Sequence, residues 1–190
     1  PLAQEHAAAA APATAAAWGD AALRVLSVGR LTYYKGFDTL ISAVAGYPQV
    51  RLLIAGEGEQ RAMLQDLIVQ ERAAQGCANV QLLGAVSEEE KHALFNSCDV
   101  FALASRERTE AFGLVLVEAM QHGKPCIVSD LEGSGMSWVV SQAGGGRCYA
   151  AEQVQAWKRA IAQCMASKSQ LAAMGQSAKA AAQSRFTIAQ

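Results

Sequence analysis

The chain has 190 residues, of which 52% are hydrophobic, and it carries a formal net charge of −1. These values suit one domain with a large core, and they exclude a global field that would draw the protein to nucleic acid or anionic lipid. The apolar stretches reach only about ten residues, which is too short to span a bilayer.

The first segment, residues 1–20, begins at Pro1, is rich in alanine and is nearly uncharged. It lacks the basic region and the leucine-rich region of a signal peptide. We interpret it as a linker or frayed segment in preference to a short helix, and we place the folded domain at residues 21–190. The chain is therefore expected to be part of a longer protein.

From residue 23 onward, short aliphatic runs alternate with helical patterns. The predicted strands are residues 23–28, 50–55, 80–83, 100–104 and 126–129, and the predicted helices are residues 37–45, 59–75, 88–97 and 114–122. Ser87 and Glu90 form a capping box before one helix, and Gly123 followed by Pro125 ends another. Repeated strand–helix units predict an α/β fold with a Rossmann-like, doubly wound parallel sheet and helices on both faces.

The tail, residues 153–185, is polar and rich in alanine, with two helical stretches broken near residues 167–169. It shows no strand pattern, so we expect it to pack on the outside, with Trp157 and Met165 as packing residues. The five cysteines stand at positions 77, 98, 126, 148 and 164 without CxxC spacing. This spacing indicates reduced thiols in a cytoplasmic protein.

Ligands of open α/β sheets bind outside the carboxyl ends of the strands, which directs attention to the loop 29–36, GRLTYYKG. It combines Gly29 and Gly36 with the cations Arg30 and Lys35, just before a helix. These features suit a phosphate or diphosphate, and a solvated turn with incidental charges explains them equally well. The P-loop pattern GxxxxGK[ST] is absent.

Two other patterns favour structural roles. In GEGEQR, residues 56–61, Arg61 replaces the third glycine of a dinucleotide fingerprint and two acids would repel pyrophosphate, so a tight turn into a helix is the better interpretation. His92 and His122 fall on polar helix surfaces, and His122 suits a helix C-terminus. The sequence contains no Ser/His/Asp or Cys/His arrangement and no metal-ligand cluster.

The segment EAFGLVLVE is the richest in possible chemistry. Phe112 and Gly113 precede or begin a helix whose first backbone N–H groups can bind an anion. Glu110 lies in the loop before that helix, and Glu118 lies about one turn inside it among apolar residues, where a carboxylate needs a partner such as a vicinal diol. Alternatively, Glu110 is a favourable charge at the helix N-terminus and Glu118 is a solvated helix residue.

Four segments keep a shared order and spacing that includes an E-x7-E pattern. They are SVGRLTYYKGFDTLISA, VRLLIAGEGEQRAML, VQLLGAVSEEEKHALFNSCDVFALAS and EAFGLVLVEAMQHGKPCIVSD. Together they resemble the C-terminal half of the retaining, GT-B-fold glycosyltransferases of family 4 (glycosyl transferases group 1), over about Leu23 to Arg185. Residues 133–146, GSGMSWVVSQAGGG, are similar to a variant in some bacterial surface-polysaccharide members, often mannosyltransferases.

The resemblance implies a role for each matched residue. The candidate catalytic residues are Arg30 and Lys35, which would hold the diphosphate of the donor and steady the leaving group, and Glu110, which would contact the donor sugar. The candidate donor-binding residues are Gly29 beside the phosphates, Gly84, Ala85 and Val86 around the nucleobase, Phe112, Gly113 and Leu114 on the sugar and phosphates, and Glu118 on the ribose hydroxyls. No metal or cofactor is implied, and the substrate is a nucleotide-diphosphate sugar such as a UDP- or GDP-sugar.

The resemblance also implies a second, N-terminal domain that binds the acceptor. This domain is not among the matched segments, so the chain alone is expected to lack transfer activity. Ala111 departs from the family pattern, in which proline is common. The implied enzyme is a retaining hexosyltransferase of bacterial surface polysaccharide or glycolipid synthesis. It would be cytoplasmic or at the inner face of the cytoplasmic membrane, with a glycan or lipid-linked glycan as acceptor and no nucleic-acid partner.

Two alternatives remain open. A non-catalytic α/β nucleotide-binding or interaction module would explain the fold, although the intact acids and basic loop argue against it. A sugar-nucleotide epimerase differs in motif order around the second acid, and a phosphorylase would need a pyridoxal-phosphate lysine, which nothing in the sequence marks.

Overall fold

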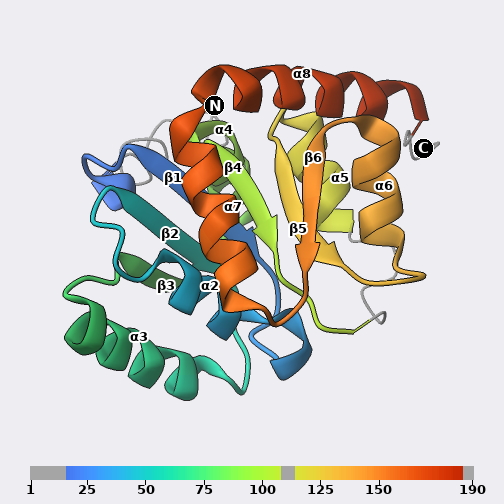
Figure 1. Ribbon diagram of the computed structural model, residues 1–190. Helices are drawn as coiled ribbons and strands as arrows, with labels where there is room; N and C mark the ends of the chain where they lie inside the picture. Colours follow the sequence, from blue (N-terminus) through green and yellow to red (C-terminus); the bar gives the residue numbers. More distant parts are fainter. Residues whose placement is uncertain (1–15, 108–113, 186–190) are drawn as a thin grey trace, which may run out of the picture.

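The computed structural model of the chain describes residues 16–107 and 114–185. Its centre is one six-stranded sheet in the order β3-β2-β1-β4-β5-β6, and every neighbouring pair of strands is parallel (Figure 1). The strands are β1 (Leu23–Val28), β2 (Val50–Ala55), β3 (Val80–Gly84), β4 (Val100–Leu103), β5 (Cys126–Asp130) and β6 (Gly146–Ala150). The sheet confirms the predicted doubly wound α/β fold.

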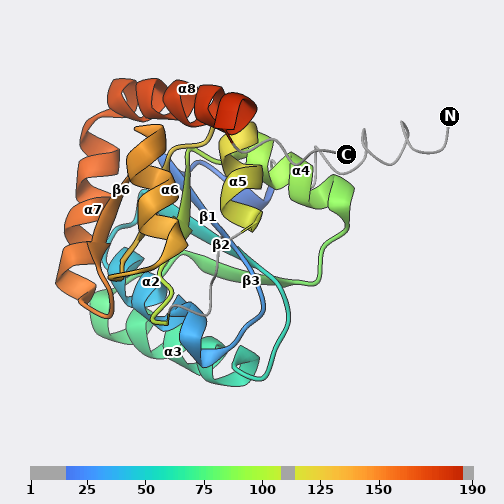
Figure 2. The ribbon, with the colours of Figure 1, turned by 90° about the vertical axis from the view of Figure 1, so that its right-hand side faces the viewer.

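Helices cover both faces of the sheet, as Figures 1 and 2 show. The helical elements are η1 (Tyr33–Lys35), α2 (Phe37–Val44), α3 (Arg61–Gln75), α4 (Glu88–Ser97), α5 (Leu114–Gln121), α6 (Gly135–Ala143), α7 (Val154–Ala166) and α8 (Lys168–Arg185). One face packs against α2, α3 and α7, and the other packs against α4, α5, α6 and α8. None of the helices within the described ranges combines the length and apolarity needed to cross a membrane.

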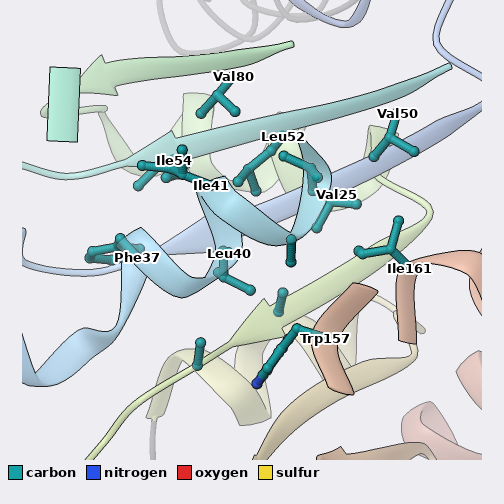
Figure 3. Packing of buried hydrophobic residues seen from close by; sticks show 14 of the residues in the cluster. Val25, Phe37, Leu40, Ile41, Val50, Leu52, Ile54, Val80, Trp157 and Ile161 are labelled. Atoms are coloured by element: carbon teal, nitrogen blue, oxygen red, sulfur yellow. The ribbon is translucent and has the colours of Figure 1, made fainter. Parts of the chain in front are cut away.

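The core consists of two layers because alternate strand residues point to opposite faces. Leu52 and Leu53 are both fully buried, but they belong to different hydrophobic clusters on the two sides of β2. This explains why the central strands β1, β2 and β4 consist mostly of apolar residues. Figure 3 shows one layer, in which Val25, Leu52 and Ile54 of the sheet lie near Leu40 and Ile41 of α2 and Trp157 and Ile161 of α7.

The predicted caps and the break in the tail are present. Ser87 Oγ accepts a hydrogen bond from the N–H of Glu90, while the Glu90 carboxylate accepts one from the N–H of Ser87. The tail divides at Ser167 into α7 and α8. Trp157 of α7 is fully buried over α2 and Met165 packs against the same cluster, so both are packing residues, as predicted, although the tail is less external than expected.

Two elements, α6 and β6, occupy a segment to which the sequence pattern assigns no secondary structure. Glycines flank both elements, and β6 is an edge strand whose residues are half-buried or exposed. The sequence of β6, GRCYA, lacks the aliphatic residues that mark the other five strands, including the other edge strand β3, VQLLG.

The predicted linker over residues 1–20 needs correction at its end. Residues 16–18 form a helical turn, and Trp18 is only 3% exposed within the cluster on the α4/α5 face. Its indole N–H donates a hydrogen bond of 2.8 Å to Ser97 Oγ. A tryptophan fixed in this way makes residues 16–20 part of the packed domain, and residues 1–15 lie outside the described ranges.

Candidate functional site

The strand order reverses between β1 and β4, so the loops that follow these two strands diverge at the carboxyl edge of the sheet. Such a switch point is where open α/β sheets bind ligands. The structure joins the two loops there, because the N–H of Arg106 donates a hydrogen bond of 2.7 Å to Tyr34 O. Gly36 adopts φ +65° directly against Ala104, where an added Cβ would lie 2.1 Å from the carbonyl oxygen. The basic loop is therefore fixed against the segment that follows β4, at the switch point.

The two cations of loop 29–36 have different environments. Arg30 is exposed, whereas Lys35 is only 8% exposed and folds back across the loop. A Cβ built on Gly29 would lie 3.3 Å from Lys35 Cε, so the missing side chain makes room for the lysine stem. The Lys35 ammonium lies 5.6 Å from the centre of the Tyr34 ring. The loop can thus offer one exposed and one buried positive charge to an anion.

The turn after β2 lies beside this loop and is hydrogen-bonded to it. The N–H of Leu31 donates to Glu57 O at 2.9 Å, and the N–H of Gln60 donates to Leu31 O at 3.0 Å. Arg61 pairs with Glu57 at 3.2 Å and begins α3, two residues later than predicted. GEGEQR is therefore a turn into a helix, as its sequence indicates.

The loop that follows β3 lies next to the turn after β2. Gly84 is buried with φ +83°, and its carbonyl accepts a hydrogen bond of 2.8 Å from the N–H of Gly56. Ala85 is exposed, and Val86 packs partly against the α4/α5 cluster. These three predicted site residues therefore lie between the end of β3 and the start of α4.

Helix α5 carries Leu114, which is 67% exposed, and Glu118, whose side chain is 36% exposed. Lys91 of α4 places its ammonium 3.0 Å from Glu118 Oε2. The predicted site residues Glu110, Phe112 and Gly113 lie outside the described residues. Of the eleven candidates, the structure thus places eight at the carboxyl edge: Gly29, Arg30, Lys35, Gly84, Ala85, Val86, Leu114 and Glu118.

Sequence reasoning missed Arg106, whose side chain is only 11% exposed. It pairs with Asp38 of α2 at 2.5 Å and with Glu152 after β6 at 3.2 Å. Its guanidinium also stacks 4.6 Å from the centre of the Tyr33 ring. The sequence signal that could have found it is a cation shortly after the buried end of β4. In the structure, Arg106 links the basic loop to α2 and to the segment after β6.

The histidines of α4 and α5 meet, which was not anticipated. His92 Nδ1 lies 2.9 Å from His122 Nε2, and His122 Nδ1 lies 2.8 Å from Asn96 Oδ1. If the Asn96 oxygen accepts, His122 Nδ1 carries the proton, and Nε2 accepts from His92. Burial, then the proximity of His92 and Lys124, lowers the pKa of His122, which favours this neutral form.

The cysteines are all free, as predicted. Burial raises the pKa of Cys98 to about 12 and that of Cys164 to about 11, so both thiols stay protonated and unreactive. Within residues 16–107 and 114–185, no group of three or more His, Cys, Asp or Glu side chains is placed to hold a metal ion.

Comparison with protein families gives a match over nearly the whole chain. The family described as Glycosyl transferases group 1 matches residues 17–181. D-rhamnosyltransferase WbpZ of Pseudomonas aeruginosa is 35% identical over 164 residues, which are 85% of this chain and 41% of WbpZ. The chain thus spans about two fifths of this curated relative.

Solved structures show the same architecture. Anabaena HepE in complex with UDP and glucose aligns with a TM-score of 0.77 at 27% identity, covering 88% of this chain and 45% of that one. The C-terminal domain of LpcC, a glycosyl transferase group 1 family protein from Francisella tularensis, aligns with a TM-score of 0.76 at 17% identity. That alignment covers 92% of this chain and 93% of the LpcC domain, and at this identity it shows the fold alone.

Proposed function

We propose that this chain, which belongs to the glycosyl transferases group 1 family and has the fold of a GT-B glycosyltransferase C-terminal domain, binds the nucleotide-diphosphate sugar donor. The observation that carries the proposal is the linkage of the basic loop after β1 to the turn after β2, and of that turn to Gly84 at the end of β3, at the carboxyl edge of the sheet. Glu118 lies on the helix that follows β4 at the switch point. The diphosphate would lie near Arg30 and Lys35, the base near Gly84, Ala85 and Val86, and the ribose near Glu118.

This arrangement suits the departure of a nucleoside diphosphate from the sugar. Negative charge grows on the β-phosphate as the glycosidic bond breaks, and fixed cations stabilise it most strongly where water is excluded. Lys35 is buried in its loop before any ligand arrives, so its charge needs little reorganisation. Glu110, Phe112, Gly113 and Leu114 would contact the sugar and phosphates, as the family resemblance implies.

The full reaction requires a second domain in this proposal. The chain spans 41% of WbpZ and 45% of HepE, so it corresponds to less than half of each. We place the acceptor, a glycan or lipid-linked glycan, on that second domain and expect this chain alone to bind donor without transferring sugar. The same proposal includes a hexosyl donor and retention of the anomeric configuration. It also includes family 4 membership and a role in surface polysaccharide synthesis.

Several observations support the remaining parts of the proposal. HepE was crystallised with UDP, which supports a nucleotide partner for the related site. Five free thiols support a cytoplasmic location. A position of the full-length protein at the inner face of the membrane is part of the same proposal. The cations Arg30 and Lys35 are proposed to act in place of a metal ion. A non-catalytic nucleotide-binding module is the second candidate, and it shares the donor site but not the chemistry.

Nucleotide binding is tested by titrating UDP and GDP into the isotope-labelled chain and following its amide NMR signals. We expect shifts at Gly29, Lys35 and Glu118 at millimolar nucleotide or below. Arg30→Gln should weaken binding about tenfold, because it removes one charge-assisted phosphate contact. The control Arg159→Gln changes an exposed arginine on α7 and should leave the affinity unchanged. Absence of shifts at these positions for both nucleotides would refute the donor site.

A further inference from the structure

The Glu118 carboxylate is held from outside its own helix. Lys91 of α4 lies 3.0 Å from Glu118 Oε2 and 2.8 Å from Glu88 Oε2. The Lys91 side chain is only 15% exposed, whereas that of Glu88 is 74% exposed. Burial lowers the pKa of Lys91, but its pairs with Glu88 and Glu118 outweigh burial and leave the pKa above its ordinary value. Lys91 is therefore a permanent cation between two acids.

This contact leaves part of the carboxylate unused. Glu118 Oε2 is buried beside the Lys91 ammonium, at 3.0 Å, whereas the Glu118 side chain as a whole is 36% exposed. The accessible part of the side chain therefore lies outside the ion pair, where Oε1 can accept a hydrogen bond from a ligand. An ionised carboxylate has about four acceptor positions, so the charge can be fixed by Lys91 while a hydroxyl fills the open one.

Lys91 can act as a fixed support because α4 and α5 are linked a second time. One turn further along α5, His122 contacts His92 at 2.9 Å and Asn96 at 2.8 Å. The start of α4 is fixed by the Ser87 and Glu90 capping box, directly after the loop that is proposed to hold the base. The Lys91–Glu118 pair is therefore part of a two-point contact, which we call the α4–α5 clasp (Lys91, His92, Asn96, Glu118 and His122).

We propose that Lys91 is a positioning residue, which holds the Glu118 carboxylate in the orientation that receives the ribose diol. This rests on the proposed donor site. Lys91 itself would not touch the nucleotide, since its ammonium is occupied by Glu88 and Glu118. Without Lys91, Glu118 would face the Glu88 charge without compensation and turn toward solvent, away from the diol. The loss should then be confined to ligands that carry ribose hydroxyls.

The test compares UDP or GDP, whichever binds the chain more tightly, with its 2′,3′-dideoxy analogue. Lys91→Met should weaken binding of the ribonucleotide about tenfold and change that of the dideoxy analogue by less than about twofold. Lys91→Arg keeps the charge and should recover most of the affinity. Glu118→Gln should show the same ligand-selective loss, and adding Lys91→Met to it should cause little further loss, because the two residues act as one unit.

The outcomes separate the inference from the donor site. If Lys91→Met weakens both ligands equally, Lys91 acts on the phosphates or the fold, and the positioning role is wrong. If Lys91→Met changes neither ligand while Glu118→Gln remains selective, the inference fails and the donor site stands. If Glu118→Gln is not selective, the ribose assignment fails, and the role of Lys91 fails with it. Thermal unfolding of each variant identifies any loss of fold.

Discussion

Two regions of the carboxyl edge, the basic loop 29–36 and the α4–α5 clasp, are held in place by different forces. The loop is fixed mainly by its backbone, through hydrogen bonds to Glu57 and Gln60 and close packing of Gly36 on Ala104. The clasp is fixed by side chains, through the Lys91–Glu118 pair and the His92–His122 contact. Backbone packing does not respond to pH, whereas side-chain charges and imidazoles do. The loop is therefore expected to keep its position at a pH where protonation of an imidazole weakens the clasp.

Substituting Gly36, at the end of the loop, tests the role of backbone packing most directly and should have the largest effect on stability. Gly36→Ala places a Cβ 2.1 Å from Ala104 O at φ +65°, where backbone would have to move. We expect a loss of more than about 3 kcal/mol in the free energy of unfolding, measured by urea denaturation. The matched control is Gly76→Ala, which also has positive φ (+78°) but nothing within 4 Å and should cost about 1 kcal/mol. Equal losses would show that close packing does not fix the loop.

Arg106 tests whether the loop also depends on charge. Arg106→Met leaves Asp38 and Glu152 without their shared cation and should destabilise the fold by about 2 kcal/mol. Arg61→Met removes an exposed pair with Glu57 and should cost less than about 1 kcal/mol. Both are measured by the same denaturation experiment. A loss at Arg106 no larger than that at Arg61 would leave backbone packing as the sole support of the loop.

The pH dependence of stability tests the clasp and is the smallest of the three effects. Burial first, then His92, Lys124 and Lys179 lower the pKa of His122, and Glu118 opposes them. The unfolded chain therefore binds more protons just below the ordinary histidine value of about 6.5. Stability from this group is complete above that pH and falls as the pH decreases through the lowered folded-state pKa.

His122→Gln keeps a neutral polar side chain and removes this titration. We expect the variant to lose less stability than the unmodified chain when unfolding is measured from pH 8 down to pH 5. Both proteins share every other titrating group, so the difference between the two curves isolates His122. Parallel curves would mean that protonation of His122 does not disturb the clasp.

The central strands and most helices could be predicted from local patterns. Buried strands such as β2 show as aliphatic runs because both of their faces are covered, and the Ser87–Glu90 capping box lies within four consecutive residues. The edge strand β6, GRCYA, could not be predicted because it has no aliphatic run, whereas the other edge strand, β3, keeps a valine and two leucines. Trp18 was placed in a linker because nothing in its neighbours shows that Ser97 receives its N–H.

The sequence by itself determined the class of fold, the loops at the carboxyl ends of the strands and the candidate cations and acids, because these depend on short-range periodicity and residue chemistry. Only the tertiary structure decided which of them meet. Lys91 and Glu118 pair across two helices, and Arg106 joins Asp38 and Glu152 from three separate elements. Such contacts depend on how the sheet twists and how the helices pack on it, so local sequence does not encode their distances. The burial of Lys35 and the lowered pKa of His122 follow from the same packing.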